Sequence, residues 1–400
     1  MFRLLVFSAL LLLVGAASAQ PADSLSGSAS ASLLTILPGD EVYSQFGHSG
    51  YRIHDPASGL DKTYNYGTFD FEQPFFLFRF VRGRLDYQLD TAPYELELDK
   101  YAFLRRPMIE QHLALPPETV QSLYDLLETN ALPENRAYRY DFFFDNCSTR
   151  LLDILDDALE SSGHGRLDLP DSERAKSFRE LIALYITDTP LLRFGINLGL
   201  GIPTDRDALA RERVFLPVEL MNQFDVALFD GQRLVAATDT VVTVPDYVGE
   251  RTAFDWPKLV LWLVLLAGLA TTIGGFVRGR RSTAAGRRGD SLLFAITGLS
   301  GLILAMLWLG TEHAVTGPNM NLLWAWPTHL LAAWWLRKPA LPRWMRAYLG
   351  AAGITAIAIV LFWRVLPQAL PAPILPIVLL LALRSIVRVY APRKALEHTS

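Results

Sequence analysis

The sequence predicts an α+β exported domain followed by an all-α membrane domain of about five transmembrane helices. Of its 400 residues, 51% are apolar and 20% are charged, so the chain is more hydrophobic than most soluble enzymes of this size. Residues 20–256 carry 38 acidic and 21 basic residues, a net charge of −17, whereas residues 257–400 carry 3 acidic and 15 basic residues. This division excludes one uniform globular domain, and the acidic part argues against nucleic acid as a partner.

The N-terminus has the pattern of a secretory signal peptide over residues 1–19. Arg3 precedes the apolar run 4–14, and small residues at 17–19 provide a cleavage site. A first transmembrane helix is the alternative interpretation, but the apolar run is short for a membrane span. The pattern therefore indicates export of the domain that follows.

Residues 20–34 are rich in Ser and Ala, which favours a flexible tether before a catalytic domain over 35–256. Within that domain the residue pattern indicates a mixture of strands and helices that begins with a strand hairpin. The expected elements are strands over 42–54, 63–71 and 138–144, a strand pair within 231–247, and helices over 116–130, 146–159 and 176–185.

The last third of the chain, residues 257–390, contains five apolar stretches. Each approaches the roughly 20 residues that a helix needs to cross the hydrocarbon layer. The third is the shortest and contains Pro327, which is unfavourable inside a helix, and His329. The five stretches cover 257–277, 291–311, 322–336, 346–364 and 370–388.

Basic residues mark alternate connections between these stretches. Lys and Arg cluster after the first, third and fifth stretches, whereas the loops 312–321 and 365–369 contain a single charge, Glu312. The positive-inside rule places the basic connections in the cytoplasm and these two loops across the membrane, with the exported domain. The tail over 391–400 is then expected in the cytoplasm.

Cys147 is the only cysteine of the chain, so it cannot form an internal disulfide. Its neighbours are polar, unlike those of a buried structural cysteine. Asn146 or Ser148 can cap a helix that starts here, and the amide groups and dipole of a helix N-terminus lower the pKa of a thiol. Arg150 adds a positive charge one turn further on. This pattern indicates a reactive thiol, and an inert buried cysteine is the alternative.

A reactive thiol needs a base, and His48 is the best candidate among the seven histidines. It lies in Gly47-His48-Ser49 on the first expected strand, which holds an imidazole rigidly and can present it to the start of a helix. His54 is the rival, but its position against the turn is typical of a solvated histidine. We therefore expect His48 and Cys147 to act as a catalytic dyad.

Other chemistries lack their residues in this sequence. It contains no H-E-x-x-H, no cysteine pair and no tight His/Asp cluster, so we expect no metal site. The serine-hydrolase pattern G-x-S-x-G is absent, and the glycine-rich run 195–201 lacks the spacing of a phosphate loop. We expect no cofactor.

Two further segments on the exported side could contact lipid. Segment 74–84 holds several phenylalanines beside Arg79, Arg82 and Arg84, a composition that favours the membrane interface and a phosphate group. A core helix with a solvated end is the alternative. The loop 312–321 either lines a substrate cleft or simply connects two helices.

Six motifs occur together in the chain: Gly47-His48-Ser49-x-x-Arg52, Tyr64-Asn-Tyr-Gly-Thr-Phe-Asp-Phe71, Asp145-Asn-Cys-Ser-Thr-Arg150, Thr204-Asp-Arg, Phe215-Leu-Pro217 and Asn319-Met-Asn-Leu-Leu-Trp324. In these motifs the chain resembles the bacterial inner-membrane proteins that include lipoprotein N-acyltransferases of the Lnb type. The resemblance covers roughly residues 40–230 and the following helices. The order of a histidine strand before a cysteine helix also resembles circularly permuted papain-like folds.

The resemblance implies a membrane-bound thiol acyltransferase. Such an enzyme moves a fatty acyl chain from phospholipid, or from the lipoprotein's own diacylglyceryl group, through a thioester on Cys147 to the N-terminal amine of lipoproteins. Lipoproteins and phospholipid are then its partners, and His48 is its base. The orienting third residue is not fixed: we choose Asp70, with Asn65 and Tyr66 as competitors. Substrate contacts are expected from Arg52, Tyr66, Asn146, Arg150, His313, Asn319 and Asn321.

Two other functions fit the same residues. The dyad could serve hydrolysis, in a peptidase, amidase or phospholipase of the cell envelope. A non-catalytic envelope assembly protein would tolerate loss of the thiol. Acyl transfer predicts a water-poor site at the membrane surface, whereas hydrolysis requires an open groove.

Overall fold

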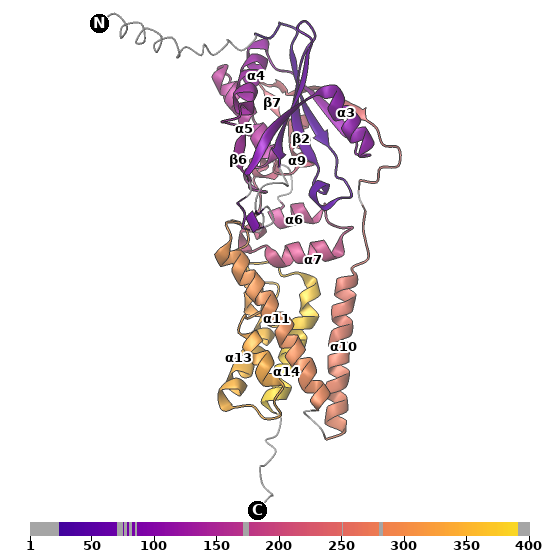
Figure 1. The fold of residues 1–400 in the computed structure, drawn as a ribbon, viewed down its shortest axis with the longest axis vertical. Coiled ribbons are helices and arrows are strands. Elements are labelled where there is room, and N and C mark those ends of the chain that lie inside the picture. The colour runs from indigo at the N-terminus through magenta and orange to yellow at the C-terminus, as the bar shows by residue number, and fades with distance from the viewer. Residues whose placement is uncertain are drawn as a thin grey trace, which may run out of the picture.

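The computed structural model describes residues 24–69, 75, 78–79, 82–84, 86–170, 176–249, 251–279 and 283–390. The chain forms a sheet-rich domain stacked end to end on a bundle of long helices (Figure 1). This arrangement confirms the predicted α+β domain followed by a helical domain. The predicted signal peptide over 1–19 and the predicted tail over 391–400 lie outside the described residues.

A seven-stranded antiparallel sheet forms the centre of the first domain, in the order β6-β4-β3-β2-β1-β5-β9. The predicted hairpin is β2 and β3, but β2 begins only at His48, because a 3₁₀ turn, η1 (Val42–Ser44), replaces the first part of the expected strand. The strands of the sheet are β1 (Ser30–Ile36), β2 (His48–Asp55), β3 (Leu60–Thr68), β4 (Asp86–Pro93), β5 (Met108–Leu113), β6 (Ala137–Arg139) and β9 (Val235–Val242).

Strand β1 occupies residues that the composition assigns to a flexible tether, and that prediction is wrong for 30–34. β1 pairs with β2 on one side and with β5 on the other, so it is an inner strand. Leu33 and Leu34 enter the cores on opposite faces of the sheet, as the alternation of a strand requires. The polar side chains of Ser32 and Thr35 are buried as well.

The expected strand pair within 231–247 also forms differently. β9 joins the main sheet by pairing with β5. The short strand β8 (Gln232–Arg233) instead pairs with β7 (Leu228–Phe229) in a separate hairpin. β8 and β9 therefore do not pair with each other, and the partner of each lies outside residues 231–247.

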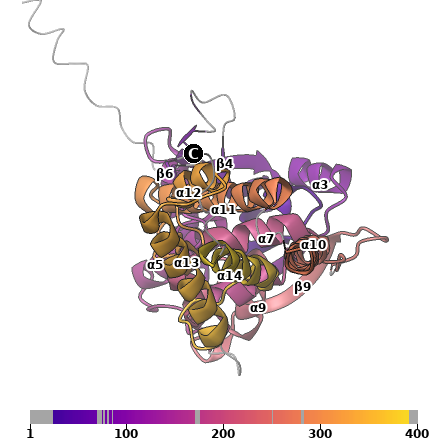
Figure 2. The ribbon, with the colours of Figure 1, turned by 90° about the horizontal axis from the view of Figure 1, so that it is seen from below.

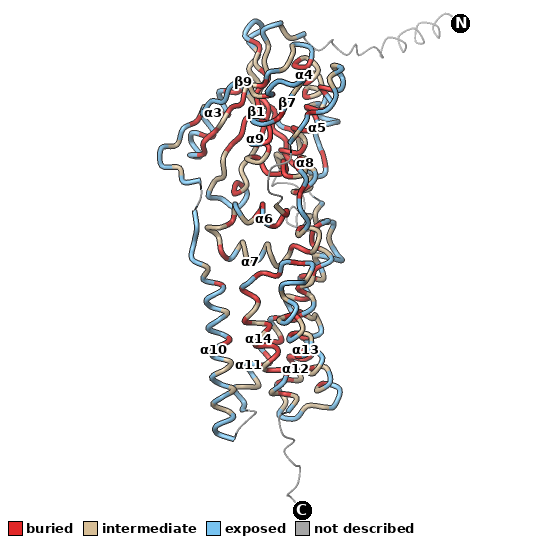
Figure 3. The backbone as a smooth tube through the Cα atoms, turned by 180° about the vertical axis from the view of Figure 1, so that it is seen from behind, coloured by how far each residue is buried: buried red, intermediate tan, exposed pale blue. Residues whose placement is uncertain are grey.

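Helices cover both faces of the sheet. Leu151 and Leu155 of α5 are fully buried in the larger core together with Tyr51 of β2. Figure 3 shows this buried layer between the sheet and its helices. The core therefore fixes α5 against the strand that carries His48. On this face lie α4 (Pro117–Ala131), α5 (Cys147–Ser161) and α9 (Pro217–Val226), and on the opposite face lies α3 (Tyr94–Phe103).

Helix α7 (Pro190–Gly199) joins the two domains and lies across the end of the helix bundle (Figure 1). The carbonyl groups of residues 198–200 accept hydrogen bonds of 2.8–3.1 Å from the side-chain amides of Asn319, Asn321 and Gln368. Carbonyl groups at a helix C-terminus otherwise lack partners, so these amides fix α7 on the bundle. The neighbouring short helices are α6 (Phe178–Ala183), η2 (Ile202–Asp205) and α8 (Ala210–Arg213).

Four helices in the described part of the chain are long and apolar enough to cross a membrane, by length and composition. Seen from below, α14 lies among its neighbours and α10 lies at one edge (Figure 2). The four are α10 (Trp256–Val277), α11 (Ala284–Gly310), α13 (Arg343–Phe362) and the helix in which η4 (Ala372–Ile374) continues into α14 (Leu375–Val389).

The third predicted span is not a continuous helix, so the described part of the chain has four long apolar helices and one broken segment in the place of the third span. It is a 3₁₀ turn, η3 (Met320–Leu323), an irregular stretch with Pro327, and the short helix α12 (His329–Leu336). This broken segment runs antiparallel to α11, with hydrogen bonds from Ser291 to Ala333 and between Thr297 and His329. A side chain at Gly301 of α11 would collide with the Ala325 carbonyl, so close contact with the irregular backbone requires glycine there.

We expect the broken segment to cross the membrane despite its short helix. In a Cys147→Ser background, a single cysteine at exposed Ala57 should react with an impermeant maleimide in cells whose outer membrane is opened. A single cysteine at exposed Ala340, between α12 and α13, should react only after the inner membrane is permeabilised, because the basic residues nearby favour the cytoplasm. Labelling of Ala340→Cys before permeabilisation would contradict this topology.

Candidate active site

Cys147 is the first residue of α5, and Asn146 caps the helix. The Asn146 side-chain oxygen accepts hydrogen bonds from the backbone N–H groups of Ser148 and Thr149, at 2.8 and 3.0 Å. Its amide nitrogen donates to the carbonyl groups of Phe142 and Phe215, both at 2.7 Å. All of these bonds are intramolecular and Asn146 is 2% exposed, so the side chain fixes the position of Cys147 and keeps no polar group for a substrate.

The first turns of α5 are tied to strand β2. The hydroxyl groups of Ser49 and Ser148 are 3.1 Å apart, and the Tyr51 hydroxyl donates to the Leu151 carbonyl at 2.9 Å. Ser49 directly follows His48 in the chain. The start of the cysteine helix is therefore held beside the start of the histidine strand. A direct contact between the His48 imidazole and Cys147 stays a prediction.

The Cys147 side chain lies where β3 departs from β2. The two strands pair from Tyr51 and Tyr64 outward to the turn, and a β-bulge then interrupts β3 between Asn65 and Thr68. Gly67 in this bulge has a φ of 90°, a conformation that favours glycine, and a Cβ there would lie 3.4 Å from the Cys147 Cβ. The thiol occupies the resulting gap.

A backbone amide of β2 reaches the sulfur in this gap. The N–H group of Ser49 hydrogen-bonds to the Cys147 sulfur, and the N–H groups of Cys147 and Ser148 also face it. These donors stabilise negative charge at the position of the sulfur.

A chain of hydrogen bonds sets the proton of His48. The Thr63 hydroxyl donates to the Ala92 carbonyl at 3.0 Å, so it accepts from the Asn65 amide nitrogen at 3.4 Å. The Asn65 oxygen then faces His48 Nε2 at 3.1 Å and can only accept. His48 therefore carries its proton on Nε2, which leaves the lone pair of the neutral ring on Nδ1.

Burial opposes charge on both members of the pair. It raises the pKa of the Cys147 thiol, and the nearby N–H groups offset only part of this effect. Burial lowers the pKa of His48 to about 4, against the hydrogen bond to Asn65, and Lys100 and Arg106 lower it further. The expectation of a thiol pKa lowered by the helix N-terminus is wrong, because desolvation outweighs the amide groups. The resting pair is a neutral thiol and a neutral imidazole.

The third residue was left open by the sequence, and the structure places Asn65 beside His48. Asp70, our choice, lies outside the described residues. The other competitor, Tyr66, faces the core instead, where its hydroxyl accepts a hydrogen bond from Asn130 at 2.8 Å. Asn65 follows the core-facing Tyr64, so the alternation of a strand turns it toward the side of His48.

Tyr138 is a further residue at the site, and sequence reasoning did not single it out. Its hydroxyl is buried without a hydrogen-bond partner among the described residues, and it lies 3.8 Å from the Cβ position of Gly67. It therefore faces the gap that holds Cys147. The aromatic run before Cys147 contained this tyrosine, but the run alone could not show which ring points to the thiol.

Two arginines predicted to contact substrate have partners within the protein. Arg52 pairs with Asp61 at 2.7 Å and with the buried Glu110 at 2.9 Å. Arg150 pairs with Asp145 at 2.6 Å and lies over the Tyr138 ring. These contacts neutralise buried charge and brace β2 and α5. A substrate contact by either arginine stays a prediction.

The predicted residues of the loop 312–321 separate into two groups. Asn319 and Asn321 are buried and bind the end of α7, so they join the domains. His313 instead lines a large apolar cavity at the junction of the domains. Its ring also packs against Gly83 of the segment 74–84. The loop is therefore more than a plain connection between helices.

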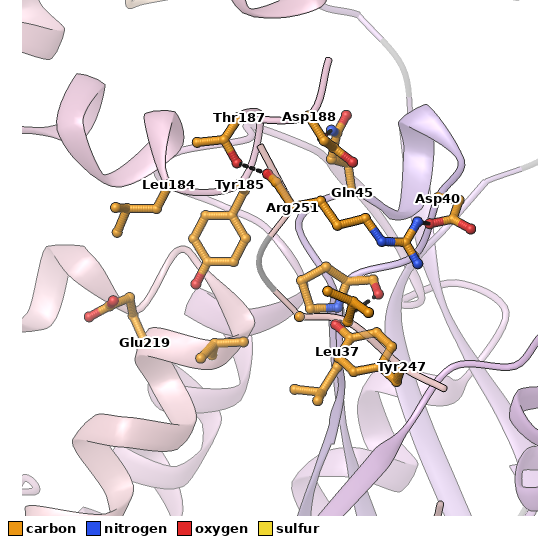
Figure 4. A pocket seen from close by; sticks show the side chains of 15 residues that line it. Leu37, Asp40, Gln45, Leu184, Tyr185, Thr187, Asp188, Glu219, Tyr247 and Arg251 are labelled. Carbon is orange, nitrogen blue, oxygen red and sulfur yellow. Dashed lines mark hydrogen bonds and ion pairs between the residues drawn. The ribbon is translucent and has the colours of Figure 1, made fainter. Parts of the chain in front are cut away.

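This junction cavity has a volume of about 950 Å³. Its walls come from α6 and α7, from the loop that contains His313, from Phe46 and Phe142 of the sheet domain, and from Trp256 and Leu307 of the membrane helices. A smaller pocket of about 330 Å³, lined by both polar and apolar side chains, lies nearby (Figure 4). Gln45 lines this pocket and the next residue, Phe46, lines the junction cavity. Two hollows therefore flank the segment that leads into His48.

The fold defines a multi-pass membrane protein with a sheet domain in which the cysteine helix starts beside the histidine strand. No group of three or more His, Cys, Asp or Glu side chains in the described part of the chain could hold a metal ion. Residues 20–182 match the family model described as the Lnb N-terminal periplasmic domain, and residues 250–395 match that of the Lnb transmembrane domain. The chain belongs to the Lnb family, which confirms the resemblance, and its sheet domain is periplasmic.

No curated protein and no solved structure matched the chain in the same comparisons. The histidine strand does precede the cysteine helix. Likeness to permuted papain-like folds stays a prediction.

We expect iodoacetamide to modify Cys147 only slowly at neutral pH in the folded protein. Because burial favours the neutral thiol, the reactive thiolate should form only above the free-cysteine pKa of about 8.5. The modification rate, followed by intact mass spectrometry in detergent, should rise with pH to a midpoint above that value. Urea-unfolded protein is the control and should show the ordinary midpoint. A midpoint lowered in the folded protein would rule out the neutral pair.

Proposed function

We propose that this protein is a membrane-bound thiol acyltransferase. In this proposal it transfers a fatty acyl chain through a thioester on Cys147 to the N-terminal amine of lipoproteins. One observation carries the proposal: the Cys147 sulfur lies in a gap beside the histidine strand, where His48 is held with its proton on Nε2. Membership of the Lnb family supports a lipoprotein substrate.

In the first half-reaction the sulfur attacks the ester carbonyl of the donor lipid, and His48 Nδ1 accepts the thiol proton. The N–H groups of Cys147 and Ser49 supply hydrogen bonds to the oxyanion. The buried Tyr138 hydroxyl is a further donor facing the same gap. The C–O bond then breaks, the lipid alcohol takes the proton from His48, and the acyl chain remains on sulfur.

In the second half-reaction the lipoprotein amine attacks the thioester carbonyl. His48 accepts a proton from the amine and returns one to the sulfur as the C–S bond breaks. The products are an amide on the lipoprotein and the free thiol, so the reaction needs no cofactor or metal ion. Cys147 is 9% exposed, which limits the access of water to the thioester.

The proposed location is the bacterial inner membrane, with the C-terminus in the cytoplasm. The periplasmic domain, the apolar helices and the basic residues at alternate connections support this orientation. The proposed partners are lipoproteins and phospholipid. The acidic periplasmic domain, with a net charge of −17 over residues 20–256, disfavours nucleic acid.

We expect Cys147→Ser to abolish N-acylation while the protein still folds and enters the membrane. His48→Ala should lower the rate by about 10²–10⁴-fold, because proton transfer by a positioned base contributes that much. Combining the two changes should cost little beyond Cys147→Ser, since residues that act as one unit are not additive. Mass spectrometry of lipoprotein N-termini in cells that depend on the variant measures the outcome.

His54→Ala is the matched control for this dyad. His54 lies at the far end of the same strand, half-exposed and 3.6 Å from Asp61, so its loss should be mild. Near-normal N-acylation by Cys147→Ser would refute catalysis by the thiol. Release of free fatty acid without N-acylated lipoprotein would instead identify a hydrolase.

We expect Asn65→Ala to lower kcat by about 10–100-fold with a smaller change in KM, because the imidazole loses the group that orients it. Asn65→Asp still accepts from Nε2, but its charge favours the imidazolium. This variant should therefore raise the pKa of His48 from about 4 and move the acid limb of the rate profile to higher pH. Wild-type kcat and pH profiles in both variants would exclude a positioning role for Asn65.

A further inference from the structure

We infer that the junction cavity binds one acyl chain of a membrane diacylglycerolipid that serves as the acyl donor. This inference rests on the proposed function, because it assigns the donor of the same site. It requires a cavity that adjoins the Cys147–His48 pair at one end, reaches the level of the membrane at the other, and suits a chain of methylene groups.

The sheet-domain wall of the cavity comes from the segments that lead to His48 and Cys147, although neither of these side chains lines it. Phe46 lies two residues before His48, and Phe142 lies five residues before Cys147. Their rings meet edge to face with centroids 4.9 Å apart, and both line the cavity. The Phe142 carbonyl is bound by Asn146, the cap of the cysteine helix. The segments that carry the two reactive side chains therefore converge at this wall.

The opposite wall comes from the membrane helices. Trp256 begins α10, and Leu307 lies in the last turns of α11. Leu191 of α7 and Trp256 are 59% and 46% exposed, so the cavity has an apolar rim that is not covered by protein. This rim continues into the exposed apolar faces of α10 and α11, which is the surface that lipid chains cover.

The chemistry of the walls suits an acyl chain better than a polar ligand. The volume of about 950 Å³ lies within the range of about 300–1,000 Å³ that is common for ligand pockets. Aromatic and aliphatic side chains dominate the lining. The Thr316 hydroxyl, one of the few polar groups there, lies 3.0 Å from the backbone carbonyl oxygens of both Leu307 and His313, so its single proton already has an acceptor within the protein. The interior therefore offers apolar contact and little for a headgroup to bind.

Helix α7 forms one side of the junction cavity. Its C-terminus is fixed by amide groups of the membrane domain, so the helix cannot easily close the cavity. Gly195 lines the cavity, and a Cβ built there meets no atom within 4 Å. A longer side chain at this position would thus extend into the open space of the cavity and leave less length for the acyl chain.

The test measures acylation of Cys147 by phosphatidylethanolamines whose chains have about 8, 12 or 16 carbons, in detergent, by intact mass spectrometry. Gly195→Leu should lower kcat/KM for the longest donor at least about tenfold and leave kcat/KM for the shortest donor unchanged. Each methylene group of the acyl chain that loses its contact should lower kcat/KM about fourfold. Gly350→Leu is the matched control, because this helical glycine of α13 also faces open space but lies outside the cavity.

A second measurement does not depend on catalysis. In Cys147→Ser, a phosphatidylethanolamine with a photoreactive group near the end of one chain should crosslink to residues 190–200 or to Leu307. Crosslinks confined to the outer faces of α10 and α13 would overturn the inference, as would an unchanged chain-length profile in Gly195→Leu. If wild-type Cys147 accepts no acyl chain from any of these phosphatidylethanolamines, the inferred donor is overturned, whereas the proposed function fails only if Cys147→Ser keeps normal N-acylation of lipoproteins.

Discussion

The side chain of Asn146 is the interaction on which the reactive site depends. It satisfies two N–H groups at the start of α5 and two carbonyl groups from separate segments, at Phe142 and Phe215. An N-cap of this kind contributes about 1 kcal/mol, and each buried carbonyl left without a partner would cost about 1–3 kcal/mol more. One buried amide thereby fixes Cys147, the aromatic wall in front of it and the loop before α9 relative to each other.

Side-chain amide groups also join the two domains. Asn319, Asn321 and Gln368 satisfy the last carbonyl groups of α7, and Gly201 and Ile202 continue the contact through backbone bonds to Val315 and Pro318. These buried hydrogen bonds fix the position of the sheet domain relative to the helices. The sheet domain is therefore attached to the helices by these contacts as well as by the chain itself.

The sequence predicted the parts of the fold and site that depend on local patterns. Asn146 before Cys147 indicates a helix start, and Gly47-His48-Ser49 indicates a strand, whatever surrounds them. The features that it missed depend on distant residues. β1 is a strand because β2 and β5 flank it, and the third span is broken where Gly301 admits the backbone of the irregular segment. The thiol pKa is likewise raised by burial, which no local motif records.

A neutral resting pair bears on the choice between acyl transfer and hydrolysis. A buried thiol and imidazole avoid the cost of separated charges until a carbonyl group arrives to take up the developing charge. The thioester then persists as long as water is scarce, and the nucleophile that reaches it decides the outcome. An α-amino group has a pKa of about 7.7–8.0, so an appreciable fraction is neutral and nucleophilic near pH 7. The proposed transfer therefore requires a site that keeps water from the thioester and admits a lipid-anchored amine, and the burial of Cys147 meets the first of these conditions.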